Sequence, residues 1–277
     1  MSFLASVAPK SSLAGEEFPF SVPAVATLER LDCSARVTFF VGENGSGKST
    51  LLEAIAAAAG LPVVGSESVD ADATLGAQRA LARKLKLAWR RPTHRGFFLR
   101  AEDFFGFAKY LSKLRAELLQ RLEEIDVEYA DRSAHARGLA AGPVAGSLRD
   151  MERRYGVNLD ANSHGESFLH LFRNRFVPGG LYLLDEPEAP LSPQSQLGLM
   201  AMMDDMLRED AQFIVATHSP ILLAFPGARI YTFDDPPVRE VAYEELESVN
   251  LTRAFLNEPE RYLRHLVGRE EDGGMKG

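Results

Sequence analysis

The stretch Gly42-Glu43-Asn44-Gly45-Ser46-Gly47-Lys48-Ser49-Thr50 decides how the rest of this chain is interpreted, because it fits the pattern G-x-x-x-x-G-K-[ST]. Residues 36–41, just before it, are β-branched and aromatic, as in a strand, and residues 51–59, just after it, are strong helix formers. An ordinary glycine-rich turn would not need both flanks. The order of strand, loop and helix therefore predicts a phosphate-binding loop.

Each residue type in the loop has a physical reason. Glycines let successive backbone N–H groups converge on an anion, and the helix N-terminus adds its partial positive charge. We expect Lys48 to reach the β- and γ-phosphates of a nucleotide and Ser49 to hold a bridging Mg2+ ion. The other loop residues expected to contact the nucleotide are Asn44, Gly45, Ser46, Gly47 and Thr50.

Composition limits the class of protein. The chain has 277 residues and a formal net charge of −8, which argues against a protein that coats nucleic acid with its whole surface. Cys33 is the single cysteine, so no internal disulfide is expected. The start of the chain lacks the pattern of a secretion signal, and no stretch is apolar enough to span a bilayer. These observations predict a cytoplasmic protein without a membrane span.

The first half of the chain contains a basic segment, defined here as residues 79–100. Its lysines and arginines occur before any acidic residue appears, and it includes two expected strands, at residues 86–89 and 96–99. One interpretation is a solvated pair of strands with basic edges. The other is a patch that binds nucleic acid or an acidic partner, and both stay open.

The flanking regions give coarser expectations. The residues up to about Glu17 are small and polar, which predicts a loose lead-in segment without regular structure. An irregular strand region is expected after it, at residues 22–31. A surface loop is expected at residues 63–78.

Apolar residues at alternating spacings of three and four predict one amphipathic helix from 101 to about 125, whose stripe packs on the core. This covers about three heptads, too few for a long coiled-coil arm. The glycine-rich residues 138–146 predict a break in the helical region.

Two expected strands in the second half end in residues suited to chemistry. An apolar run at 181–184 leads into Asp185 and Glu186, as in a buried parallel strand whose carboxyl end faces a ligand. We expect Asp185 to hold the magnesium and Glu186 to polarise the water that attacks the γ-phosphate. The run at 212–216 leads into Thr217 and His218, and this histidine is expected to sense the γ-phosphate.

A third signal precedes an apolar helix at 168–172. Ser163 and Glu166 form the S-x-x-E capping box, which would by itself explain these residues. The position before Asp185 and the Ser-x-Gly-Glu order, which includes Gly165, also suit a second helix N-terminus that binds phosphate.

Taken together, these motifs resemble ATPases of the ATP-binding-cassette (ABC) type. They look less like transporter cassettes than like the soluble AAA-type ATPases that are related to the recombination and phage-defence ATPases. The resemblance runs from about Val37 to Pro220. It implies an α/β P-loop NTPase fold, with a mostly parallel core sheet flanked by helices. The whole chain, 1–277, is expected to form a single ATPase domain, whose helical insertion at about 101–175 carries the signature motif. The matching segments are Walker A (Gly42 to Thr50), the signature (Ser163 to Glu166), Walker B (Asp185, with catalytic Glu186), the D-loop (Glu188 to Ser192) and the switch histidine (His218).

The resemblance further implies catalytic roles for Lys48, Glu186 and His218, with ATP and Mg2+ as cofactors and an ATP-dependent homodimer that acts on nucleic acid or a protein partner. The sequence departs from the pattern at Asn162, His164 and Ser192. No glutamine follows residues 97–99 where the Q-loop should stand, which leaves Arg100 or Glu102 in that place. The alternatives are a transporter's nucleotide-binding subunit, which would be expected to have that glutamine, and a small-molecule kinase, which would not need Glu186.

Overall fold

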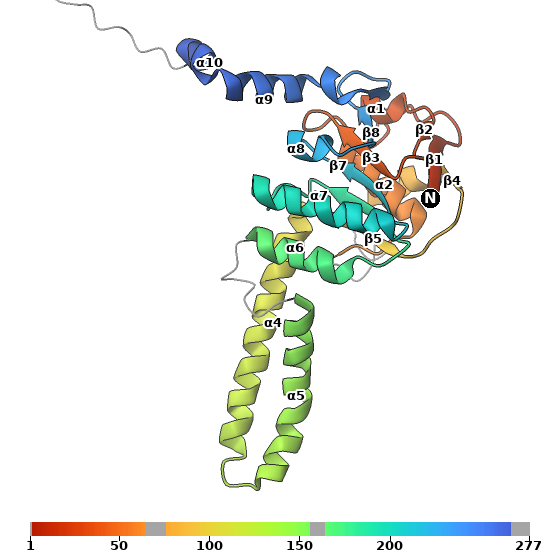
Figure 1. Ribbon diagram of the computed structural model, residues 1–277. Helices are drawn as coiled ribbons and strands as arrows, with labels where there is room; N and C mark the ends of the chain where they lie inside the picture. Colours follow the sequence, from red (N-terminus) through yellow and green to blue (C-terminus); the bar gives the residue numbers. More distant parts are fainter. Residues whose placement is uncertain (1, 65–75, 156–163, 267–277) are drawn as a thin grey trace, which may run out of the picture.

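The structure is a computed structural model that describes residues 2–64, 76–155 and 164–266 (Figure 1). Its largest element is a six-stranded sheet with the strand order β5-β6-β7-β3-β8-β9. Neighbouring strands from β5 to β8 are parallel, and β9 is antiparallel to β8. The predicted α/β fold with a mostly parallel core sheet is confirmed. The strands are β3 (Val37–Val41), β5 (Gly96–Arg100), β6 (Leu181–Asp185), β7 (Gln212–Ala216), β8 (Arg229–Thr232) and β9 (Arg239–Val241).

A second sheet contains three antiparallel strands in the order β2-β1-β4. The expectation of a loose lead-in before Glu17 is wrong, because β1 lies between the other two strands and buries its apolar residues. The two strands expected in the basic segment are confirmed, but they do not pair with each other: β4 pairs with β1, whereas β5 belongs to the large sheet. The strands are β1 (Leu4–Pro9), β2 (Leu31–Asp32) and β4 (Leu85–Trp89).

One buried side chain joins the two sheets. The amide oxygen of Gln212 in β7 accepts hydrogen bonds from the backbone N–H groups of Phe3 and Leu4, at 2.7 and 2.8 Å. Its amide nitrogen donates to the carbonyl oxygens of Leu4 and Cys33. Gln212 is fully buried, so these bonds satisfy backbone groups that water cannot reach. The N-terminal strand is fixed by a residue far along the chain.

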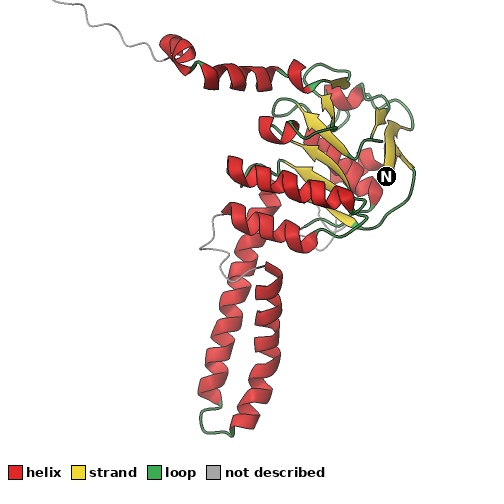
Figure 2. Cartoon of the chain, viewed as in Figure 1, coloured by secondary structure: helices red, strands yellow, loops and turns green. Residues whose placement is uncertain are grey.

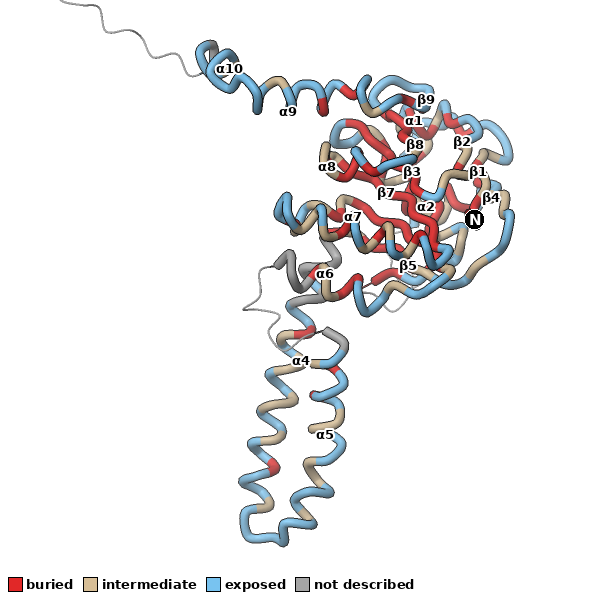
Figure 3. Tube along the Cα trace, viewed as in Figure 1, coloured by how far each residue is buried: buried red, intermediate tan, exposed pale blue. Residues whose placement is uncertain are grey.

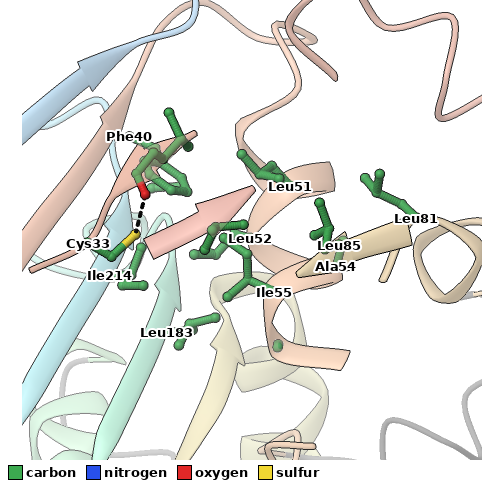
Figure 4. Close-up of a cluster of buried hydrophobic side chains, with 14 of the residues drawn as sticks. Cys33, Phe40, Leu51, Leu52, Ala54, Ile55, Leu81, Leu85, Leu183 and Ile214 are labelled. Carbon is green, nitrogen blue, oxygen red and sulfur yellow. Dashed lines mark hydrogen bonds between the residues drawn. The ribbon is translucent and has the colours of Figure 1, made fainter. Parts of the chain in front are cut away.

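Helix α2 (Lys48–Ala59) packs between the two sheets and forms one hydrophobic core with them. Figure 4 shows its residues Leu52 and Ile55 against Leu183 of β6 and Ile214 of β7. The helix ends at Gly60, whose φ of 65° is the left-handed conformation that a helix C-cap requires, as the sequence indicates.

The opposite face of the large sheet is covered by α6 (His164–Arg175), α7 (Pro193–Arg208) and α8 (Pro220–Leu223), as Figures 1 and 2 show. Aromatic side chains dominate this second core. The rings of Tyr182 and Phe213 stack with centroids 5.1 Å apart, and Phe172 lies in the same cluster. Both faces of the sheet are therefore buried, which explains the continuous apolar runs of its strands.

Helices α4 (Ala101–Glu128) and α5 (Ala134–Tyr155) form an antiparallel hairpin, here called the arm, that projects from the body (Figures 1 and 3). Two expectations fail here. The apolar stripe of α4 packs on α5, through Leu111, Leu148 and Met151, and not on the core. Residues 138–146 do not break the helix, since α5 runs through them with Pro143 inside. Packing against α4 stabilises a segment whose own helix propensity is poor.

The remaining helices are short or peripheral. Residues 22–31, expected as an irregular strand region, contain α1 before β2. The loop expected at 63–78 lies mostly outside the described residues. After β7 and α8 the chain forms β8 and β9 of the large sheet, and α9 and α10 then extend away from the body (Figure 1). These elements are α1 (Pro23–Ala26), α3 (Gly76–Lys84), η2 (Tyr243–Glu245), α9 (Glu247–Asn257) and α10 (Pro259–Leu266).

Candidate functional site

The predicted phosphate loop connects β3 to the first turn of α2. Gly45 and Gly47 have φ values of 82° and 104°, which glycine adopts without strain. A Cβ added to Gly47 would lie 2.8 Å from Cγ1 of Val22, so this position also has no room for a side chain. The loop backbone is thus bent tightly at the N-terminus of a 12-residue helix, which is the geometry of an anion site.

Lys48 begins α2 and is buried beneath the loop. Its Nζ atom donates to the carbonyl oxygens of Gly42 and Glu43, at 2.8 and 2.7 Å. Burial lowers the pKa of Lys48, while Glu186 and Asp185 oppose that effect. The structure therefore holds the ammonium group inside the loop, with carboxylates near it.

Ser49 and Asp185 meet although 136 positions separate them in the sequence: the Ser49 hydroxyl donates to Oδ1 of Asp185 at 3.0 Å. Asp185 is the last residue of β6 and is buried. Burial raises its pKa from 3.8 to about 7, and the nearby carboxylates of Glu53 and Glu186 act in the same direction. A cation bound beside this buried carboxylate would stabilise its ionised form.

The oxygens of Ser49 and Asp185 suit a magnesium ion, which needs few protein ligands, better than a metal whose ligands all come from the protein. Within residues 2–64, 76–155 and 164–266, no group of three or more His, Cys, Asp or Glu residues could hold a metal. Mg2+ is usually bound through one or two protein oxygens together with substrate phosphates and water. Ser49 and Asp185 could supply those protein oxygens next to the phosphate loop.

Glu186 and His218 lie side by side at the ends of β6 and β7. Nε2 of His218 is 3.5 Å from Oε1 of Glu186, and both side chains are partly exposed, at 38% and 44%. Glu186 has a φ of 50°, which is uncommon outside glycine, and its N–H donates to the carbonyl of Ala216. This backbone turn directs the Glu186 side chain to the edge of the sheet where Asp185 also lies.

The expected D-loop has structural contacts. Glu188 accepts a hydrogen bond from the backbone N–H of His218 at 2.6 Å, and burial raises its pKa. Ser192, which departs from the family pattern, caps α7 by accepting from the N–H of Ser195 at 3.2 Å. Glu188 therefore fixes the backbone that carries His218.

A pocket of about 280 Å³ opens beside the Ser49–Asp185 pair, and sequence patterns alone did not predict all of its residues. Three of them, Glu53, Gln78 and Arg100, come from α2, α3 and β5. In the sequence, Arg100 stands at the end of the basic segment and in the place of the Q-loop glutamine. The lining residues are Ser49, Glu53, Gln78, Arg100, Ala101, Asp185 and Glu186.

The structure describes the remaining residues that were predicted to contact the nucleotide only in part. Asn44 and Gly45 are exposed on the loop, and Ser46 and Thr50 are half-buried. Ser163 lies outside the described residues. Gly165 and Glu166 are in the first turn of α6, and the side-chain surroundings of this turn lie outside what the structure describes. The assignment of this signature therefore stays a prediction.

Comparisons with known proteins bear on the class of protein. A family model described as an AAA domain matches residues 14–73, and a second AAA-domain model, whose description names the AbiEii toxin and a type IV TA system, matches residues 168–224. No curated protein matches the sequence. The two matched segments contain the phosphate loop and the Asp185–His218 region. Together with the geometry above, they support a P-loop ATPase, and the fold is that of a P-loop NTPase.

Several solved structures are similar over most of their length. A nucleotide-free ATP-binding cassette from an ABC transporter is 13% identical, with a TM-score of 0.46 and coverage of 94% of this chain and 98% of that one. The Smc head domain from Pyrococcus furiosus is 11% identical, with a TM-score of 0.41 and coverage of 94% and 100%. The protein cbiO1 from Clostridium perfringens is 14% identical, with a TM-score of 0.41 and coverage of 97% and 100%.

Among the described residues, no helix has the length and apolar character needed to cross a membrane.

Proposed function

We propose that this chain binds Mg-ATP and hydrolyses it. The observation that carries the proposal is the contact between Ser49 and Asp185, which joins the phosphate loop to the end of a distant core strand. The buried ammonium of Lys48 is close enough to the same carboxylate for its negative charge to raise the pKa of Lys48. A loop built for phosphate, a cation to neutralise it and two oxygens for Mg2+ are thereby gathered at one edge of the sheet.

Different residues of this chain would bind the phosphates and the metal. The loop amides and the α2 N-terminus would cradle the phosphates, and Lys48 would exchange its carbonyl partners for phosphate oxygens. Ser49 and Asp185 would hold the metal. When bound, Mg2+ supplies positive charge that stabilises the phosphate oxygens as the bond breaks.

Hydrolysis needs a group that orients water. Glu186 has the position for this role, because its carboxylate is partly exposed at the edge where Asp185 ends β6. His218, 3.5 Å from that carboxylate, would orient Glu186 or contact the terminal phosphate. The fixed backbone between Glu188 and His218 supports this arrangement.

We also propose that catalysis uses an ATP-dependent homodimer. Glu186 and His218 are partly open to solvent in a single chain. If the chain follows the ABC-type pattern that it resembles, the signature, Ser163 to Glu166, would lie over the nucleotide of the partner chain, where a hydroxyl and a helix N-terminus would complete the site. Nucleic acid or a protein would be the substrate of the ATP cycle, and a cytoplasmic location stays a prediction.

The transporter-subunit alternative gains no support from the site. Strand β5 ends at Arg100, and this arginine lines the pocket in the region where a transporter cassette would be expected to have a glutamine. The kinase alternative does not explain why Glu186 and His218 lie together. The soluble ATPase is the function that the geometry favours.

Binding of a fluorescent ATP analogue with Mg2+, together with phosphate release, tests the proposal. Lys48→Ala should lose binding, because the phosphate oxygens lose their ammonium partner. Lys113→Ala is a matched control, since that lysine is 78% exposed on the arm. Parental affinity in folded Lys48→Ala would refute the assignment of the loop.

A mixing experiment tests the dimer. Lys48→Ala and Ser163→Arg should each be inactive alone, whereas a heterodimer of the two has both defects in one site and leaves the other intact. Partial recovery on mixing supports a shared site. Full activity of Ser163→Arg alone would refute the role of the signature.

A further inference from the structure

The pocket beside Ser49 and Asp185 contains an ion pair that the phosphate-loop pattern does not explain. Nη2 of Arg100 lies 2.8 Å from Oε1 of Glu53, and the two side chains are only 17% and 9% exposed. Glu53 lies one helical turn beyond Ser49, on the same face of α2. Arg100 ends β5 in register with Asp185 on β6, so their side chains share one face of the sheet.

The charges in this pocket are unbalanced without Arg100. Of the described residues that line it, three are carboxylates, namely Glu53, Asp185 and Glu186, and Arg100 is the one cation. Glu53 raises the pKa of Asp185, and Arg100 opposes that effect. The guanidinium therefore compensates an acidic cluster at the place where the terminal phosphate and its metal are expected.

Two polar atoms at this pocket have no hydrogen-bond partner within the part of the chain that the structure describes. Nε of Arg100 and Oε1 of Gln78 are buried, and neither forms a hydrogen bond with any residue that the structure describes. A buried polar atom without a partner is costly and is commonly explained by a ligand or by water. An arginine donor suits a phosphate oxygen, and a glutamine oxygen suits a water molecule.

We propose that Arg100 contacts the terminal phosphate of bound ATP and makes this chain prefer ATP to ADP. The inference rests on the proposed function. Glu53 is its positioning residue: it holds the guanidinium in the pocket when no phosphate is there to accept its hydrogen bonds. With a divalent cation at Ser49 and Asp185, the carboxylate of Glu53 stays compensated, and Arg100 can turn from Glu53 to phosphate. The planar guanidinium provides paired donors that match phosphate oxygens.

The test is the ratio of equilibrium affinities for the nonhydrolysable analogue AMP-PNP and for ADP, both with Mg2+. Arg100→Gln should weaken AMP-PNP binding about tenfold to hundredfold, as expected for a charge-assisted hydrogen bond, and ADP binding by less than about threefold. Arg90→Gln, at an exposed arginine at the end of β4, is the control for loss of a positive charge and should leave the ratio unchanged.

A second variant keeps the test valid if Arg100→Gln folds poorly because Glu53 is left as an uncompensated buried charge. The double variant Glu53→Gln/Arg100→Gln removes both charges and should also lose the preference for AMP-PNP. Glu53→Gln alone retains the guanidinium and should keep a part of it. Equal weakening of both nucleotides in Arg100→Gln, or an unchanged ratio, would overturn the inference while leaving the proposed function intact. Failure of the wild-type chain to bind either nucleotide would instead overturn the proposed function, and this inference with it.

Discussion

The most quantitative prediction concerns Asp185, whose buried carboxyl should make the protein less stable as the pH rises. Its pKa is raised from 3.8 to about 7, chiefly by burial, so the folded chain retains this proton more tightly than the unfolded chain does. The stability contributed by the protonated carboxyl is greatest below about pH 4, and it is lost progressively as the pH rises to about 7. Holding Asp185 as an anion near pH 8 costs up to about 4 kcal/mol, because each tenfold increase in proton affinity corresponds to about 1.4 kcal/mol.

Asp185→Asn removes that cost and keeps an acceptor for the Ser49 hydroxyl. In the presence of a chelator, the variant should be more stable than the wild type by about 2 to 4 kcal/mol at pH 8, and by almost nothing at pH 4. This gain corresponds to a rise in Tm of roughly 5 to 10 °C for a chain of this size. The same variant should lose most of the stabilisation that Mg-ATP gives the wild type, because it lacks the anionic ligand.

Urea or thermal unfolding at several pH values measures the difference between the two proteins. Subtracting the wild-type curve cancels the titration of shared groups that do not interact with Asp185. Asp235→Asn, at an exposed carboxylate outside the pocket, should show no such pH-dependent gain. A variant that is less stable than the wild type at pH 8, or a difference that is the same at pH 5 and pH 8, would show that Asp185 is not held at an energetic cost.

Three other perturbations test separate parts of the structure. Glu186→Gln should retain ATP affinity and slow phosphate release by roughly a hundredfold or more, and a near-parental rate would move the water-orienting role to another carboxylate. Gln212→Leu should lower the free energy of unfolding by about 2 to 5 kcal/mol, measured in urea, because the buried amides of Phe3 and Leu4 at the start of β1 lose their acceptor; an unchanged value would mean that β1 is held by other contacts. Charge reversal at Arg83, Lys84 and Lys86 should weaken any binding of DNA or RNA, measured against salt, and absence of binding at about 50 mM salt would favour the solvated-face interpretation of the basic segment.

The parts of the fold that the sequence predicted are those with local causes. The phosphate loop is a continuous motif, and its helix has a start and an end signal in Gly47 and Gly60. The contact between Ser49 and Asp185 follows from a topological rule: parallel strands place their carboxyl ends at one edge of a sheet, where ligands bind. Sequence patterns are sufficient when each element carries its own signal.

The parts that were wrong depend on contacts between distant segments. β1 is short and followed by polar residues, and it is held by Gln212, which lies 208 positions after Leu4. Helix α5 contains Gly138, Gly142 and Pro143, which disfavour a helix, yet Met151 and its neighbours pack on α4. In both cases tertiary packing overrides local propensity, and no signal within the segment itself shows this.

The pocket residues show where a sequence signal existed and where it did not. Glu53 follows Ser49 by four positions on a predicted helix, so its place beside the metal ligand could have been inferred from helical spacing alone. The position of Arg100 could not be inferred without the strand order. Arg100 lies beside Asp185 only because β5 is the neighbour of β6, and the sequence does not specify which strand occupies that edge. In the sequence Arg100 looks like one of several arginines in the basic segment; in the structure its ion pair with Glu53 and its place in the pocket distinguish it. Basic residues in this segment therefore do not share one role: Lys84 and Arg91 lie at the surface over the rings of Phe20 and Phe3, whereas Arg100 faces the site.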